Sequence, residues 1–157
     1  MKKFELTNEF ITNMFGTKLF RIRALVEFGD VEAGELGGYV EKESNLGHDD
    51  NAWVYDNAWV YGDAQVCGDA RVCGNGDYAY AHGFGSVNRT TTFFRLKDGG
   101  VGVRCGCFYG TLAQFRDKIR ETHGESAIAE EYLMLADLME LRFEEDENEV
   151  GNRKYVE

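Results

Sequence analysis

The chain has 157 residues, with 28 acidic against 17 basic side chains, a formal net charge of −11, 19 glycines and no proline. This length supports one hydrophobic core, and 11 Phe, 8 Tyr and 2 Trp residues exclude intrinsic disorder for most of the chain. The acidic balance argues against direct binding to nucleic acid, because phosphate-backbone affinity needs a basic patch.

The sequence also predicts the cellular compartment. No apolar stretch approaches the roughly 18 residues of a transmembrane helix, and Glu5, Asn8 and Glu9 interrupt the segment that follows the two N-terminal lysines. We therefore expect a cytoplasmic protein with no membrane partner. In a reducing compartment its four cysteines are expected to be thiols or metal ligands and not disulfides.

The first predicted elements are strands. The run LFRIRALVEF (19–28) is strand-like, and ELGGYV (35–40) leads into the next segment. We assign residues 1–39 to a cap of N-terminal strands.

Internal repetition dominates residues 51–74, which read NAWVYD, NAWVYG, DAQVCG and DARVCG. A period of six fits neither a helix nor an uninterrupted strand, whereas it fits a short strand followed by a corner. The Val and Ala of each unit are predicted to point inward and the Tyr or Cys outward, with Gly, Asp and Asn at the corners.

These units resemble the hexapeptide repeat of left-handed parallel β-helices. The resemblance implies a mainly β fold with C-terminal helices, in which a short left-handed parallel β-helix spans residues 40–83. Seven short strands make little more than two coils, which is too few to stand alone. The N-terminal strands and a C-terminal module are therefore expected to cap the β-helix.

That module is predicted over residues 84–143. Residues 90–96 and 101–108 flank the turn KDGG and read as a β-hairpin. Thr111 and Gln114 form a capping box that opens a helix ending at Gly124. Ser126 is expected to cap a second helix that ends near residue 143. Its predicted buried positions are Ile128, Tyr132, Leu135 and Met139, with Leu138 and Leu141 widening the stripe.

Residues 144–157 are predicted to be an acidic, disordered tail. The motifs ELGGYVEKE, NRTTTFFRLKDGG, CGCFYGTL and ETHG together resemble a family of small phage and prophage proteins. Some acidic members of such families are anti-CRISPR inhibitors. The resemblance implies a non-enzymatic anti-defence protein in the bacterial host cell, with a type II RNA-guided nuclease as its partner.

Cys105, Cys107 and His123 are the best candidates for metal ligands, because zinc binds thiolate and imidazole. A bend at Gly106 is needed to turn both sulfurs toward one point. The fourth ligand is open among His82, Cys67 and Cys73. This pattern predicts one structural zinc ion, and the alternative is two packed thiols with a histidine at a helix C-terminus.

Three further hypotheses about the function remain open. Activation of Cys107 by His123 would make the thiol a nucleophile, although no orienting group or oxyanion site is visible. A hexapeptide-repeat acyltransferase rests on the fold alone. The third alternative is a structural module that self-assembles, so a homo-oligomer is also considered. We assign no catalytic residues.

The acidic charge is concentrated near the C-terminus, where residues 130–149 contain nine carboxylates and one arginine. We expect this surface to be drawn to the basic groove of a nucleic-acid-binding protein. Two tryptophans at repeat positions are expected to supply apolar anchors. The predicted partner-binding residues are Glu130, Glu131, Asp137, Glu140, Glu144, Glu145, Trp53 and Trp59.

Overall fold

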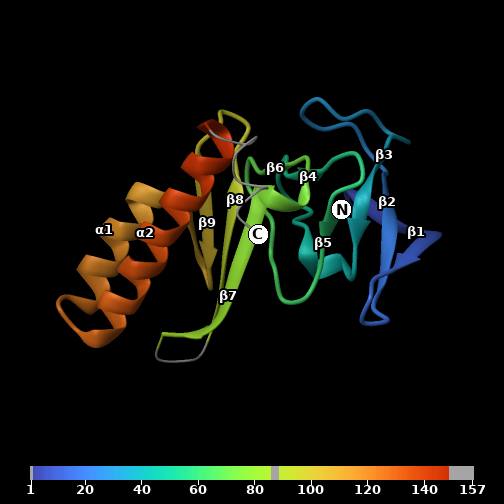
Figure 1. Ribbon diagram of the computed structural model, residues 1–157. Coiled ribbons are helices and arrows are strands. Elements are labelled where there is room, and N and C mark those ends of the chain that lie inside the picture. Colours follow the sequence, from blue (N-terminus) through green and yellow to red (C-terminus); the bar gives the residue numbers. More distant parts are fainter. Residues whose placement is uncertain (1, 86–88, 149–157) are drawn as a thin grey trace.

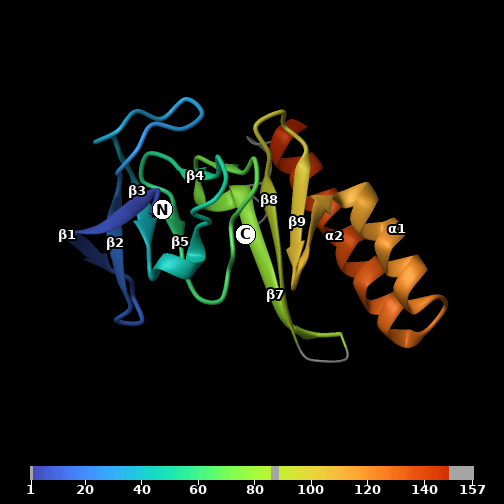
Figure 2. The same ribbon diagram turned by 180° about the vertical axis from the view of Figure 1, so that it is seen from behind.

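The structure is a computed structural model that describes residues 2–85 and 89–148, without the side chains of 145–148. Two four-stranded sheets lie on either side of a middle segment built from the repeats, and two helices cover the outer face of the second sheet (Figure 1). The view from behind shows the same order, so the N-terminal sheet and the helices form opposite ends of the molecule (Figure 2).

The N-terminal sheet has the strand order β1-β2-β3-β5. Its strands are β1 (Phe4–Thr12), β2 (Lys18–Ala24), β3 (Leu36–Val40) and β5 (Trp59–Val60). The first three strands pair antiparallel, and β5 adds in parallel to β3. Phe4 and Ile22 are fully buried on the face of the sheet that turns toward the repeats. The N-terminal strands are therefore confirmed, and β1 adds a strand that the sequence analysis did not resolve.

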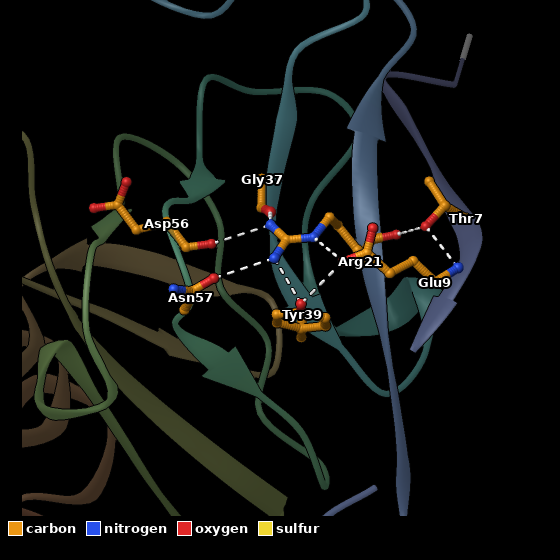
Figure 3. A network of polar contacts seen from close by, with 7 residues as sticks. All are labelled: Thr7, Glu9, Arg21, Gly37, Tyr39, Asp56 and Asn57. Carbon is orange, nitrogen blue, oxygen red and sulfur yellow. Dashed lines mark hydrogen bonds and ion pairs between the residues drawn. The ribbon is translucent and has the colours of Figure 1, made fainter. Parts of the chain in front are cut away.

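Arg21 ties this sheet to the middle segment (Figure 3). Its guanidinium donates to the Gly37 carbonyl oxygen at 2.7 Å, to the Tyr39 hydroxyl at 2.6 Å and to Asn57 Oδ1 at 3.1 Å. The Arg21 Nε also pairs with Glu9 at 2.8 Å. Hydrogen bonding to Arg21 lowers the pKa of the Glu9 carboxyl, which keeps the pair charged at neutral pH.

The predicted left-handed parallel β-helix is wrong. The repeat region contributes two-residue strands that belong to separate sheets: β5 joins the N-terminal sheet, while β4 (Trp53–Val54) and β6 (Arg71–Val72) form a two-stranded sheet of their own. Both pairings are parallel, and an isolated parallel bridge joins Leu46 to Val66. Among the described residues no sheet stacks three strands of the repeat region, so these separate pairings do not build a solenoid.

The inward-facing positions of the repeats are nevertheless confirmed. The alternating Val and Ala residues are all at most 2% exposed and share one core with the N-terminal sheet; they are Ala52, Val54, Ala58, Val60, Ala64, Val66, Ala70 and Val72. Gly38 lets β3 approach this core closely, since a Cβ there would lie 2.5 Å from the Ala58 carbonyl oxygen. The short 3-10 turns Glu43–Asn45 and Asn75–Asp77 lie at two corners.

The second sheet has the order β10-β9-β8-β7 and is antiparallel throughout. Its strands are β7 (Tyr78–Phe84), β8 (Arg89–Arg95), β9 (Val101–Cys105) and β10 (Phe108–Thr111). The predicted hairpin is confirmed as β8 and β9, but its second strand turns at Gly106 and returns as β10. Residues 78–83, the end of the predicted β-helix, instead form most of the antiparallel edge strand β7.

Strand β8 is buried on both faces. Phe94 packs against the core of the repeats, whereas its neighbour Phe93 packs against the helices. Successive side chains of a strand point to opposite faces, so the second sheet separates two hydrophobic cores. This arrangement fixes the helices on the side away from the N-terminal sheet.

The helices are α1 (Leu112–His123) and α2 (Ala127–Asn148). The predicted capping box is confirmed: Gln114 N donates to Thr111 Oγ1 at 3.2 Å, and Thr111 N donates to Gln114 Oε1 at 2.9 Å. Gly124 ends α1, with φ of 58°. Helix α2 runs five residues beyond Phe143, so part of the predicted disordered tail is helical. Residues 149–157 of that tail lie outside the described residues.

Candidate functional site

Helix α2 has a buried face that anchors it to the second sheet. Ser126 Oγ accepts a hydrogen bond from Ala129 N at 3.2 Å, as expected of a cap. Tyr132, Met139 and Phe143 are at most 8% exposed and pack against Phe115 of α1 and against β8. The helix is therefore held rigidly and presents its remaining faces in a fixed orientation.

The opposite face of α2 carries a second apolar stripe. Met134, Leu138 and Leu141 are 70%, 54% and 56% exposed, and their spacing of four and three residues places them on one side of the helix. The prediction that Leu138 and Leu141 widen the buried stripe is therefore wrong. The signal was present in the sequence, since apolar residues of this segment occupy more of the helix circumference than one buried face uses.

The predicted acidic residues divide into two groups around this stripe. Asp137 and Glu140 pair with Arg116 of α1 at 2.8 and 3.1 Å, so their charges are partly satisfied within the chain. Glu130, Glu131 and Glu144 are exposed and have no ion-pair partner in the part of the chain that the structure describes. The side chain of Glu145 lies outside the described residues.

The two predicted tryptophan anchors do not belong to this surface. Trp53 is fully buried, with its ring against Phe4 and Phe28 at centroid distances of 6.3 and 5.2 Å. Trp59 is half-buried in β5. Both lie in the middle segment, and the helices are on the far side of the second sheet (Figure 1). Trp53 therefore cannot contact a partner, and the apolar anchors near the acidic residues are those of α2.

The predicted metal ligands do come near one another. Cys105, Cys107 and His123 all line one hollow of about 340 Å³ between α1 and the β9–β10 turn. The Cys105 thiol is engaged, since Thr91 Oγ1 donates to its sulfur at 3.3 Å and Tyr132 Oη lies 3.8 Å from it. Among the described residues no group of three or more His, Cys, Asp or Glu side chains is arranged to hold a metal ion.

The zinc hypothesis makes a direct prediction. A structural site predicts about one equivalent of zinc per chain in protein purified without added metal, because structural sites hold zinc tightly. Elemental analysis measures this content. A value below roughly a tenth of an equivalent ends the hypothesis.

The candidate fourth ligands lie elsewhere. Cys67 is buried, Cys73 is exposed, and both belong to the repeat region. His82 is in β7, where its Nδ1 lies 2.7 Å from Thr90 Oγ1. The hypothesis that His123 activates Cys107 as a nucleophile needs a group that orients the imidazole. The His123 ring stacks on Tyr132 at a centroid distance of 6.0 Å. In residues 2–85 and 89–148 its ring makes no hydrogen bond, so no orienting group accompanies it.

Tyr132, which lines this hollow, has a shifted pKa. Burial is the main reason that its pKa is raised to about 12, and the neighbouring Cys105 adds to the effect. In the unfolded chain a tyrosine loses its proton near pH 10. The folded state therefore keeps a proton that the unfolded state has lost, and Tyr132 disfavours folding increasingly as the pH rises from about 10 to about 12.

When phenolate absorbance is followed during an alkaline titration, the raised pKa predicts that Tyr132 ionises late, at a higher pH than an ordinary tyrosine. The substitution Tyr132→Phe should remove one phenol from the late part of the curve and make stability less sensitive to high pH. Tyr80→Phe, at an exposed position in β7, is the matched control and should leave the late part unchanged. An unchanged late step in Tyr132→Phe would show that the hydroxyl is not buried.

The buried lysine was missed by sequence reasoning. Lys3 is 3% exposed, and its ammonium donates to the carbonyl oxygens of Asp50 and Ala52 and to Asp50 Oδ1 at 3.0, 2.6 and 3.3 Å. Burial lowers its pKa, while the Asp50 charge opposes that shift. These contacts satisfy the ammonium within the fold, so Lys3 and Asp50 form a structural clamp.

Comparison with known proteins gives no family for this chain: no family model and no curated protein matches it. Within the described residues, neither helix combines the length and apolar content that crossing a bilayer requires. The acyltransferase and self-assembly alternatives stay predictions. The face of α2 is thus the strongest candidate for a functional surface.

Proposed function

We propose that the protein is a non-enzymatic anti-defence inhibitor that binds a host type II RNA-guided nuclease through the exposed face of α2. The observation that carries the proposal is the stripe of Met134, Leu138 and Leu141, exposed on a rigid helix and bordered by carboxylates. Isolated exposed apolar residues are ordinary, but aligned ones on one helix face are typical of a binding surface.

The charges around the stripe favour a basic partner. Glu130 and Glu131 lie toward one end of the stripe and Glu144 toward the other, all exposed and unpaired among the described residues. In an antiparallel pairing of two α2 helices these ends would meet, and like charges would repel. A nucleic-acid-binding groove offers the opposite charge together with the apolar stems of its Arg and Lys side chains.

The two kinds of residue have different roles in this complex. The apolar stripe supplies affinity, because fully burying one Leu or Met side chain contributes roughly 1.5–3 kcal/mol. The carboxylates supply faster association and choice of partner, because surface charge acts mainly on the encounter rate. Their placement over the groove would exclude the nucleic acid that the groove normally binds.

A cleavage assay tests the proposal. The purified nuclease with its guide is incubated with increasing amounts of the protein before target DNA is added. We expect cleavage to fall as the protein reaches and exceeds the nuclease concentration. Full cleavage at a large excess of the protein rejects the proposal for that nuclease.

A charge variant tests the electrostatic part separately. Glu131→Gln with Glu144→Gln should lower the association rate by about threefold to tenfold at low salt and weaken its salt dependence. The control, Glu27→Gln with Glu32→Gln, removes the same charge from exposed positions in the N-terminal loop. Association rates by surface plasmon resonance make the comparison, and equal effects of the two pairs would mean that only net charge matters.

A further inference from the structure

The hollow between α1 and the β9–β10 turn has a charge opposite to that of the chain. Arg89, Lys118 and His123 line it, and among the described residues no Asp or Glu does, although the chain as a whole carries −11. Arg89 has no ion-pair partner among the described residues. Lys118 Nζ lies 3.9 Å from Glu121, and both side chains are more than half exposed, so this pair is weak.

Local geometry holds the Arg89 guanidinium at the hollow. Gly106 has φ of 60°, which favours glycine, and a Cβ at this position would clash with Arg89 Nη1. The missing side chain therefore makes room for the guanidinium against the backbone of the turn. This contact places a planar double donor at the rim, which is the group best suited to a carboxylate or phosphate.

The remaining wall of the hollow is apolar. Phe108, Phe115 and Ile119 line it beside the buried ring of Tyr132. A volume of about 340 Å³ falls within the range of roughly 300–1,000 Å³ that is usual for small-molecule sites.

A second, larger hollow lacks this character. It has a volume of about 500 Å³, and its charged lining residues are Asp30, Asp69, Asp98, Arg71 and Lys97. Asp30 pairs with Arg71 at 3.4 Å and with Lys97 at 3.6 Å. The cations of this hollow therefore stand among carboxylates, whereas no carboxylate is among the described residues that line the smaller hollow.

We infer that the smaller hollow binds a small organic anion with a flat apolar body, such as an aromatic carboxylate. The carboxylate pairs with Arg89 and Lys118 at the rim, and the ring packs against Phe108 and Ile119. Binding is non-covalent. The inference is independent of the proposed function, because the exposed face of α2 contributes no residue to this hollow.

Titration with benzoate, followed by NMR chemical shifts, tests the inference. A ligand of this size is expected to bind with a dissociation constant of about 1 mM or tighter, with shifts concentrated at Ile119, His123 and Tyr132. Benzyl alcohol lacks the carboxylate and inorganic phosphate lacks the aromatic ring, so each should bind at least tenfold more weakly than benzoate. Equal binding of benzyl alcohol, or no saturable benzoate shifts at 10 mM (about tenfold above the expected constant), overturns the inference.

Variants locate the site. Arg89→Gln with Lys118→Gln should weaken benzoate binding at least tenfold, while the circular dichroism spectrum stays that of the wild type because both side chains are on the surface. Arg120→Gln, on an exposed face of the same helix, is the matched control and should bind normally. Unchanged binding in the double variant overturns the inference, as does one equivalent of zinc bound at the hollow in the purified protein.

Discussion

The substitution Trp53→Ala is expected to destabilise the protein by about 3–5 kcal/mol, as is typical when a fully buried large aromatic is truncated. Trp53 is 0% exposed, packs edge-on against Phe4 and Phe28, and lies where the N-terminal sheet meets the repeat region. The cavity would open between the two parts of one core. Urea unfolding measures the loss, which is a large fraction of an ordinary domain's stability of about 5–15 kcal/mol.

Two companion variants make this prediction specific. Trp59→Ala changes the equivalent residue of the next repeat, which is only half-buried, and should cost roughly 1–2 kcal/mol. Trp53→Phe should cost less than Trp53→Ala, because it retains a ring and removes the indole N–H that has no hydrogen-bond partner among the described residues. Equal losses for Trp53→Ala and Trp59→Ala would contradict the burial difference described above.

Arg21→Ala is expected to cost about 2–4 kcal/mol, because it leaves several acceptors without a donor. The guanidinium bridges Gly37 O, Tyr39 Oη and Asn57 Oδ1, which belong to β3 and to a corner of the repeats (Figure 3). Arg21→Lys should recover little of the loss, since one ammonium cannot reproduce the planar fork. Thermal and urea unfolding of the variants provide the measurement.

Arg23→Ala is the control for this network. Arg23 is two residues along β2, is exposed, and pairs with the partly exposed Glu5, so its removal should cost less than about 1 kcal/mol. A loss as large as that of Arg21→Ala would mean that ordinary surface pairing, and not the bridging of two segments, gives Arg21 its effect.

Local signals in the sequence predicted local structure well. The β8–β9 hairpin, the capping box at Thr111 and the end of α1 at Gly124 all depend on residues close to one another along the chain. The inward Val and Ala of the repeats are likewise confirmed. The left-handed β-helix was wrong because sheet membership depends on long-range pairing, and a six-residue period does not say which strands join one sheet.

The candidate site was predicted in part. The acidic character of α2 is visible in the sequence, but the pairing of Asp137 and Glu140 with Arg116 is not, because Arg116 belongs to another helix. Trp53 and Trp59 occupy equivalent positions of two repeat units, so the repeat predicts the same exposure for both. In the structure the N-terminal sheet buries Trp53 completely and Trp59 only in part. Which apolar face of α2 is buried also depends on the sheet it meets, so the exposed stripe emerged only with the tertiary structure.

We propose that the apolar stripe of α2 makes the contact with a basic nuclease. The most direct test is the dissociation constant of the nuclease complex, measured for the wild type, for Leu138→Ala with Leu141→Ala, and for Leu36→Ala, an equally exposed leucine of β3. We predict at least tenfold weaker binding for the α2 pair, about 1.4 kcal/mol or more, and wild-type binding for Leu36→Ala. Wild-type affinity in the α2 pair would contradict the claim.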